Sequence, residues 1–449
     1  MKLHIIGVSV SKGRRFEIIK KVLVLGVGAQ GSAAAKRLDL EPNVEEIICA
    51  DYDAKAVENI VGQLRKARGL RVDAHDKDSI VAAAQGVDLI LNGLPLECTK
   101  NVLDAALEVK ANYQDYASTI NMENVWRESE EAKTDRDIRG EKITAPGTKK
   151  WFDSLKAQFE IYGPKFEAID RLAIVGTGSA PGLICCASRN AMKYLDKCDT
   201  IYNFVWEGAI AERFQPFWWS PVTALTDMSE AGIAFENGQF INTPAFGNPV
   251  KRQYDYMDEE ITFMEHSHDE PLHYGFNGEK YFKGCKNAYF KYAGAGMDFA
   301  KPLSEAGLLS HEEKDFNGSK IVPFDFILSH IPPAPKYKEE IQAIIDEGLK
   351  KDAGCMVVEA YGQKDGKNVL VETHVSAPGF VDSFERAGIT AEMYLTGQGG
   401  YLFSKLFLND KLNQTGLISS DMLSIEQVDT YFEYAKELGI TIDTKVKEL

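Results

Sequence analysis

The sequence predicts an α/β protein that begins with a parallel sheet, and three observations support this fold class. Short apolar runs alternate with helical segments over the first 120 residues, and a glycine-rich turn joins the first run to the first helix. Strands separated by helices favour right-handed crossovers and parallel pairing. Hydrophobic residues make up 44% of the 449 residues and charged residues 26%, which excludes a disordered, collagen-like or coiled-coil chain.

The N-terminal elements can be placed in order from residue type and periodicity. β-branched and aliphatic runs predict strands, and stretches with one apolar or small-residue side predict helices. Strands are expected at 21–25, 46–50, 70–73, 87–92 and 113–116, and helices at 32–38, 54–66, 78–84 and 100–110.

Beyond residue 122 the pattern changes. The charge-rich stretch 123–166 predicts helix, loop and helix; its charged run is a solvated face or, alternatively, a mobile lid. Hairpin signals then predict a mixed or antiparallel sheet, and helices return at 391–407 and 424–438, the second with a capping box. The hairpin signals are Asn237-Gly238, Asn277-Gly278 and Asp365-Gly366, and the capping box runs from Ser424 to Gln427. The expected domains are 1–122, an α+β part at 123–379, and C-terminal helices at 380–449.

Composition also limits the partners and the compartment. The net charge of −16 opposes binding to nucleic acid or to an anionic membrane surface. No apolar run approaches the roughly 20 residues needed to span a bilayer. The apolar stretch 3–10 is followed by lysine and arginine instead of a cleavage site, so it is not read as a signal peptide. Seven scattered cysteines without a CxxC predict reduced thiols and a cytoplasmic protein.

The glycine-rich turn has the spacing of a dinucleotide-binding loop. In GxGxxG, the first glycine permits a tight turn, the second lets the backbone approach a pyrophosphate, and the third allows close packing of helix on strand. The helix N-terminus would then receive the phosphates. The prediction is a Rossmann domain at 1–122, with a cofactor-binding loop formed by Gly26, Gly28, Ala29, Gln30 and Gly31.

Asp51 ends the second expected strand, 20 residues after Gly31. A carboxylate there accepts the ribose hydroxyls of NAD and repels the extra phosphate of NADP, so NAD is favoured, with NADP as the alternative. Asp53 competes for this role, and Lys55 would weaken the discrimination. Further cofactor contacts are expected at the ends of later strands: Asp73 and Ala74 near the adenine, and Asn92, Leu94 and Pro95 on the nicotinamide side.

Three segments resemble the saccharopine dehydrogenase superfamily: VLVLGVGAQGSAAAKRL, VDLILNGLPLECTKNVLDAALEVKANYQDYAS and, at 176–183, GTGSAPGL. The segment GITAEMYLTGQGGYLFSKLF resembles the helices that return to the Rossmann domain in that family. The resemblance implies an α+β domain that binds substrate and forms a homodimer. It also implies that Ala180, Pro181 and Gly182 lie against the cofactor or substrate, the alternative being a plain helix start. The sequence departs from the family pattern between Ser118 and Gly176, where the connection is longer.

The resemblance implies an NAD(P)-dependent oxidoreductase that acts on a CH–NH or CH–NH2 group. Its small-molecule substrate would be an amino acid, an opine-like secondary amine or a polyamine, as for the saccharopine, carboxynorspermidine and lysine 6-dehydrogenases. One alternative is a transferase resembling homospermidine synthase, which uses bound NAD transiently. The other is a noncatalytic NAD-binding sensor, since a fold does not determine a function.

Oxidation of an amine by hydride transfer requires the neutral amine, whereas a lysine-type ammonium has a pKa of about 10.4. A base is therefore needed. The resemblance matches His268 to a histidine in an HPEP-like loop of relatives, which makes it the predicted base, the alternative being a surface histidine. Asp115, at the end of the fifth strand, would orient the base or the ammonium, or else cap the next turn. His266 and His268 also form an HxH pair, but no metal is expected.

Charged and aromatic residues further along supply candidates for substrate binding. Glu207 and Trp219, which follows Phe217 and Trp218, would hold a cationic amine by charge and ring face; the alternative is a core or interface role. Arg213 and His374 are the predicted partners of a substrate carboxylate. Residues considered for similar roles, and more simply surface or core residues, are Arg252, His330 and Cys98.

Overall fold

The computed structural model describes residues 20–118 and 155–449. The chain divides into two compact units. The first comprises Met1–Asn190 and Tyr394–Leu438, and the second comprises Ala191–Met393 and Gly439–Leu449. The domain boundaries expected from the sequence lie at 122 and 379 instead. Most of the stretch 123–166, with its alternative lid, lies outside the described residues; from residue 155 onward it is helical.

A parallel seven-stranded sheet forms the centre of the first unit, in the order β19-β6-β5-β4-β1-β2-β3. The five predicted strands are confirmed. Leu25 of β1 pairs with Ala50 of β2 and with Asn92 of β4, and Asn92 in turn pairs with Asp115 of β5. The carboxyl ends of these four strands therefore meet along one edge of the sheet. The strands are β1 Lys21–Leu25, β2 Glu46–Asp51, β3 Ala67–Arg71, β4 Leu89–Asn92, β5 Asn112–Asp115, β6 Leu172–Val175 and β19 Gly416–Ser419.

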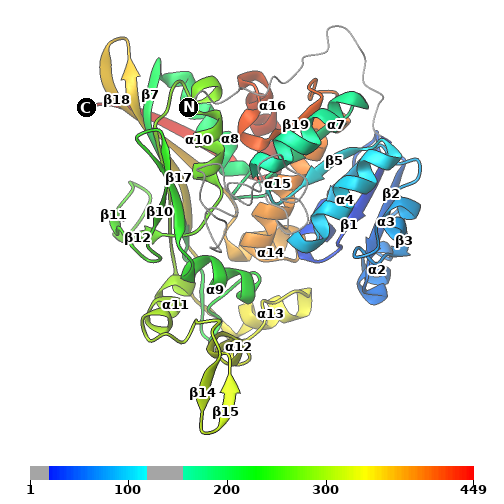
Figure 1. Ribbon diagram of the computed structural model, residues 1–449, viewed down its shortest axis with the longest axis horizontal. Helices are drawn as coiled ribbons and strands as arrows, with labels where there is room; N and C mark the ends of the chain where they lie inside the picture. Colours follow the sequence, from blue (N-terminus) through cyan, green and yellow to red (C-terminus); the bar gives the residue numbers. More distant parts are fainter. Residues whose placement is uncertain (1–19, 119–154) are drawn as a thin grey trace. The chain divides into compact units, whose positions relative to one another are not determined.

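Helices connect these strands, and Figure 1 shows α4 lying across the sheet. The predicted helix 54–66 is too long: α2 ends at Val61, Gly62 takes the C-cap, and β3 begins at Ala67. The helices of this unit are α1 Ala29–Leu38, α2 Ala54–Val61, α3 Lys77–Ala83, α4 Leu96–Val109, η2 Gln158–Tyr162, α7 Gly163–Ala168, α8 Leu183–Ala191, α15 Ala391–Leu408 and α16 Ile425–Ala435.

The return of the C-terminal helices to the Rossmann unit is confirmed. The Gln114 side chain of β5 donates to the Gly400 carbonyl of α15 at 2.7 Å and accepts from the Ser404 hydroxyl at 2.8 Å. A Cβ on Gly397 would lie 2.7 Å from the Ala33 side chain of α1, so glycine at this position lets the two helices approach closely. The predicted capping box is present, with Ser424 Oγ accepting from the Gln427 amide at 3.2 Å.

A mixed sheet forms the centre of the second unit, as predicted. Its main path is β10-β9-β13-β7-β17-β18-β20, in which β7 and β13 are parallel and β7 and β17 antiparallel. Strands β11 and β12 pair at its side. The strands are β7 Lys197–Glu207, β9 Gly232–Glu236, β10 Gln239–Thr243, β11 Val250–Arg252, β12 Ile261–Glu265, β13 Asn287–Gly294, β17 Gly354–Lys364, β18 Lys367–Ser376 and β20 Thr441–Glu448.

Two of the three predicted hairpins are confirmed. Asn237-Gly238 joins β9 to β10 and Asp365-Gly366 joins β17 to β18, each with positive φ at both turn residues. The third prediction is wrong, because Asn277-Gly278 lies inside helix α10, Glu270–Tyr281. Gly278 has a packing role there: a Cβ would lie 2.8 Å from the Cys285 carbonyl.

The remaining elements complete the second unit. Figure 1 shows α9, α11, α12 and α13 gathered at one end of this unit, with the hairpin β14–β15 projecting from it. They are α9 Pro221–Ser229, α11 Ala295–Glu305, α12 Pro323–Leu328, α13 Lys338–Glu347, α14 Phe380–Ala387, β8 Ile210–Ala211, β14 Lys314–Phe316, β15 Ser319–Ile321 and β16 Leu349–Lys351. Within residues 20–118 and 155–449, no helix is long and apolar enough to cross a bilayer.

Candidate functional site

The glycine-rich loop of the first unit requires glycine at two positions for steric reasons. Gly26 has φ +81°, and a Cβ there would lie 2.7 Å from the Gly93 carbonyl oxygen. A Cβ on Gly31 would lie 2.0 Å from the Gly26 carbonyl oxygen. These contacts explain the tight turn after β1 and the close packing of α1 on it.

Gly28 is different, because a Cβ there would meet no atom of the described residues within 4 Å. Gly28 is the N-cap of α1 and supplies no side-chain cap, which leaves the first-turn N–H groups of that helix available to an anion. The open space beside Gly28 and the available N–H groups fit a pyrophosphate. The loop and the parallel sheet together define a dinucleotide-binding domain.

Asp51 is held beside this loop by the main chain. Its carboxylate accepts from the Val27 amide at 2.9 Å and from the Asp53 amide at 3.0 Å. A carboxylate has further lone pairs for ribose hydroxyls, so the geometry is compatible with the predicted role. Asp53, the competing residue, instead caps α2 by accepting from the Lys55 amide at 2.9 Å.

Arg71 was not among the residues predicted from the sequence to contact the cofactor. It ends β3, paired in register with Asp51, and its guanidinium lies 4.3 Å from the centre of the Tyr52 ring. Its Nε donates to the Tyr52 carbonyl at 3.2 Å. An exposed arginine at this edge of the sheet can pair with a phosphate, which gives NADP a partner that opposes the effect of Asp51. The sequence signal would have been an arginine at the end of the third strand.

We expect Asp51→Ala to weaken NAD binding about tenfold and to affect NADP less, because the ribose hydroxyls lose their acceptor. Arg71→Ala should do the reverse. Calorimetric titration of both variants with both dinucleotides checks this, with Asp53→Ala as the control that removes only a helix cap. Equal losses for NAD and NADP in the Asp51 variant would contradict the assignment.

The predicted residues at the ends of β4 and β5 form a buried polar network. Asn92 Nδ2 donates to Asp115 Oδ2 at 2.8 Å and to the Tyr113 hydroxyl at 3.0 Å, and the Tyr113 hydroxyl also donates to Asp115. Burial raises the pKa of Asp115 to about 6, against the effect of these hydrogen bonds. The network therefore fixes the two strand ends, and the catalytic role of Asp115 stays a prediction.

The other predicted cofactor residues lie in loops of the first unit. Asp73 accepts from the His75 amide at 3.0 Å, and the Ala74 carbonyl accepts from Asn101 at 3.0 Å. The Leu94 amide donates to Asn92, and Pro95 is the N-cap of α4. The segment with Ala180 and Pro181 precedes α8, and Gly182 has φ +135° with its Cβ position 2.1 Å from the Gly178 carbonyl oxygen. Contacts of these residues with the cofactor stay predictions.

His268 lies in the second unit, between β12 and α10, and is mostly buried. Its Nδ1 is 2.5 Å from Glu270 Oε2, and its ring stacks on Phe290 with 4.0 Å between centroids. Burial lowers the pKa of His268, but the charge and hydrogen bond of Glu270, with smaller contributions from Asp269 and Asp227, raise it overall to about 9. The ring is therefore mainly protonated at neutral pH.

Glu207 and Trp219 are brought together at the carboxyl end of β7. Glu207 accepts hydrogen bonds from Trp219 and from Tyr292 of β13. Burial raises the pKa of Glu207 to about 7, while these two bonds and the charge of His268 lower it. A carboxyl group with this pKa can accept or release a proton near neutral pH.

Three residues around this cluster were missed: Tyr292, Asp227 and Glu392. Burial raises the pKa of Asp227 to about 8 and, together with the charge of Glu207, raises that of Glu392 to about 8. No sequence pattern could have found them, because they come from β13, α9 and the start of α15. Glu207 also lines a cavity of about 330 Å³ whose charged wall includes Glu259, Glu260, Asp298 and Lys351. An excess of carboxylates favours a cationic ligand.

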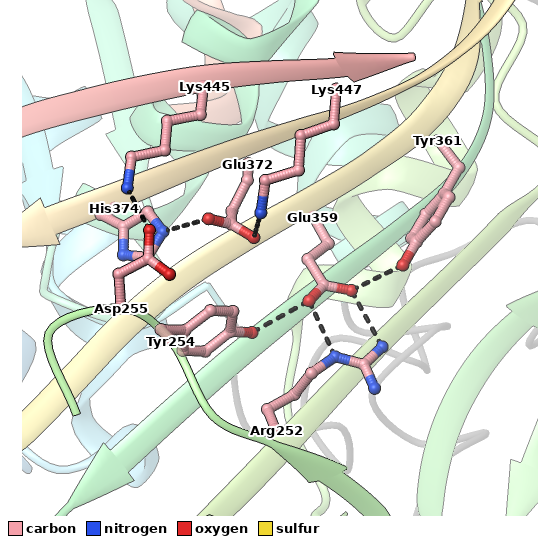
Figure 2. A network of polar contacts seen from close by, with 9 residues as sticks. All are labelled: Arg252, Tyr254, Asp255, Glu359, Tyr361, Glu372, His374, Lys445 and Lys447. Carbon is pink, nitrogen blue, oxygen red and sulfur yellow. Dashed lines mark hydrogen bonds and ion pairs between the residues drawn. The ribbon is translucent and has the colours of Figure 1, made fainter. Parts of the chain in front are cut away.

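The predicted carboxylate-binding residues already face carboxylates of the chain. Arg213 pairs with Glu347 at the surface. His374 Nε2 is 2.7 Å from Glu372 Oε1, and Lys447 contacts the other oxygen of Glu372 at 3.0 Å (Figure 2). The substrate-binding roles of Arg213 and His374 stay predictions.

Arg252 belongs to the same polar network, shown in Figure 2. Its guanidinium makes two hydrogen bonds to Glu359, at 2.8 and 2.9 Å, and the hydroxyls of Tyr254 and Tyr361 donate to the same carboxylate. Four donors on one carboxylate connect β11 and the following loop to β17.

The remaining candidate residues also lie within the described ranges. Phe217 and Trp218 are buried, and Trp218 donates to the Ala209 carbonyl at 3.0 Å. Cys98 is buried, and His330 is exposed with Nδ1 2.8 Å from the Phe326 carbonyl. Over the described ranges, no three His, Cys, Asp or Glu side chains are grouped so that they could hold a metal ion.

The buried carboxyl groups and His268 predict how stability changes with pH. The pKa values of Glu207, Asp227 and His268 are raised to about 7, 8 and 9, so the folded state binds more protons than the unfolded state. Stability should therefore fall as pH rises from 6.5, the ordinary value for histidine, through about 9. Thermal unfolding followed across this range checks this, and a melting temperature that increases with pH would contradict it.

Comparisons with known proteins agree with this geometry. Residues 22–145 match the family model of the saccharopine dehydrogenase NADP binding domain. The chain is 22% identical over 440 residues to a carboxyaminopropylagmatine dehydrogenase from Synechocystis sp., covering 94% of this chain and 96% of the relative. The resemblance to the saccharopine dehydrogenase superfamily is thus confirmed, and the chain is an NAD(P)-dependent oxidoreductase.

Two solved structures share the fold over nearly the whole chain. Saccharopine dehydrogenase (L-Glu forming) from Saccharomyces cerevisiae superposes with a TM-score of 0.63 at 12% identity, covering 95% of this chain and 100% of that one. Homospermidine synthase from Legionella pneumophila, in complex with NAD, superposes with a TM-score of 0.60 at 10% identity, covering 96% and 91%. These likenesses support the fold alone.

Proposed function

We propose that this oxidoreductase acts on the CH–NH or CH–NH2 group of a cationic amine, either an amino acid, an opine-like secondary amine or a polyamine. The observation that carries the proposal is the partly buried Glu207, with the Trp219 indole N–H and the Tyr292 hydroxyl donating to it. This carboxylate lines a cavity with an acidic wall. The similarity to a carboxyaminopropylagmatine dehydrogenase supports an amine substrate of the polyamine type.

The residues of the second unit supply binding and proton transfer. NAD(P), when bound, supplies the hydride acceptor. Glu207, with a pKa of about 7, can take the proton that a substrate ammonium must lose before oxidation. Trp219 and Tyr292 keep this carboxylate oriented. Water then adds to the resulting imine carbon, and the C–N bond breaks to release a carbonyl compound and an amine.

The experiment is a turnover assay in both directions, following nicotinamide absorbance with NAD and NADP. The panel contains lysine, saccharopine, ornithine, polyamines and carboxyaminopropylagmatine. Net turnover with one amine supports the proposal. Tight binding of a dinucleotide without turnover on any amine would contradict it and favour the sensor.

A second candidate is a transferase of the homospermidine synthase type, favoured by the likeness to the Legionella protein. Such an enzyme returns its hydride to an imine and shows no net change in nicotinamide absorbance. Mass spectrometry of amine products formed from putrescine and NAD separates it from the dehydrogenase.

Two properties complete the proposal. The homodimer implied by the resemblance can be checked by light scattering of the full chain. A cytoplasmic location is supported by the seven cysteines, all of which are free thiols.

A further inference from the structure

Glu270 is fully buried, although a carboxylate is costly to remove from water. It is the first residue of α10, preceded by the N-cap Asp269 and followed by Pro271. One of its oxygens contacts His268 Nδ1 at 2.5 Å, and the other has no hydrogen-bond partner among the described residues. The imidazole is thus the partner on which this buried charge depends.

The contact also determines which ring nitrogen of His268 is available. Nδ1 is occupied by Glu270, and the near-parallel stack on Phe290, with 9° between planes, restrains the ring. Only Nε2 is left for a ligand. A carboxylate on Nδ1 also stabilises the positive ring, as carboxylates do in other histidine pairs.

The other ionisable groups around the His268 ring either favour its protonated form or are uncharged. Asp269 beside it and Asp227 of α9 favour the protonated ring, and Glu207 of β7 interacts with it as well. His266 at the end of β12 is buried, and its pKa is lowered well below the ordinary value, so it is uncharged at neutral pH. The surroundings of His268 are therefore acidic apart from Phe290 and a neutral imidazole.

We infer that Glu270 is a positioning residue, which orients the His268 ring and keeps it protonated, so that His268 acts at neutral pH as a proton donor and not as the predicted base. This inference rests on the proposed function for its chemistry. When a C–N bond is formed reductively, the carbinolamine must lose water. The Nε2–H bond breaks, its proton joins the leaving hydroxyl, and the C–O bond breaks to release water. The ring becomes neutral and stays in contact with Glu270.

The test is an NMR titration of the full-length protein labelled with ¹³C-histidine, which needs no substrate. The His268 resonance is assigned from the spectrum of His268→Gln. In the wild type we expect His268 to titrate above neutrality. In Glu270→Gln its midpoint should fall by at least one pH unit. Glu279→Gln, an exposed carboxylate of the same helix, is the matched control and should leave the midpoint unchanged.

Two results would overturn the inference: a wild-type midpoint at or below 6.5, or a midpoint that Glu270→Gln leaves in place. If Glu270→Gln does not fold, the wild-type titration still tests whether His268 is protonated at neutral pH. The double variant His268→Gln/Glu270→Gln should fold, because it replaces the charged pair by two hydrogen-bonding amides. The titration does not depend on the amine assay. The proposed function and the inference about Glu270 can therefore be contradicted independently of each other.

Discussion

Replacing Gly28 by valine is expected to weaken NAD(P) binding more than 100-fold while the protein stays folded. The Gly28 backbone is extended, with φ −63° and ψ −163°, which an L-residue adopts without strain. Its side chain would enter the open space beside the loop, where the pyrophosphate must approach the backbone. Calorimetry with NAD and NADP measures the loss, and thermal unfolding verifies the fold.

Gly31→Val is the contrasting variant. Its Cβ would lie 2.0 Å from the Gly26 carbonyl oxygen, so α1 could not pack on the loop and the melting temperature should fall sharply. Binding by Gly28→Val at the wild-type affinity would contradict the assignment of this loop to the cofactor.

The second large effect is expected at Glu207. Glu207→Gln keeps the shape and an oxygen for Trp219 and Tyr292 but cannot accept a proton, so kcat/KM for amine oxidation should fall about 10²- to 10⁴-fold. Because Glu207 must be ionised to act as a base, the wild-type rate should increase as pH rises through about 7, and the variant should lose this limb. The pH–rate profile of kcat/KM on the amine found in the assay provides the measurement.

Glu212→Gln is the matched control, since Glu212 is an exposed carboxylate close in sequence that pairs with Lys350 at the surface. Its profile should match the wild type. A Glu207→Gln enzyme with an unchanged profile would remove Glu207 from proton transfer and leave it with, at most, a binding role.

The local features of the fold could be predicted because they depend on neighbours in sequence. The loop from Gly26 to Gly31 was correctly predicted from spacing, since Gly26 has a positive φ and Gly31 packs against the Gly26 carbonyl within one βα turn. The same holds for the turn at Asn237-Gly238 and for the Ser424 capping box. Asn277-Gly278 shows the limit: the same dipeptide lies in helix α10, where the nearby Cys285 carbonyl, and not a turn, requires glycine at 278.

The edge strand β20 was also missed. Its sequence is charged and only partly apolar, and it is a strand because it pairs with β18 along Thr441–Glu448. A pattern of alternating burial is weak at the edge of a sheet, where one side of the strand faces solvent.

What the sequence by itself determined is the dinucleotide-binding unit, the class of chemistry implied by the family resemblance, and the residue types available for amine binding. Only the tertiary structure decided what those residues can do. It brought Tyr292 of β13, a distant part of the chain, to Glu207, and it placed the Glu270 carboxylate against Nδ1 of His268, two residues away. Proton affinity depends on burial and on the nearest charges, and both are set by packing and not by order along the chain. For this reason the resemblance could predict His268 as a base, whereas our inference that it donates a proton depends on its contact with Glu270 in the folded chain.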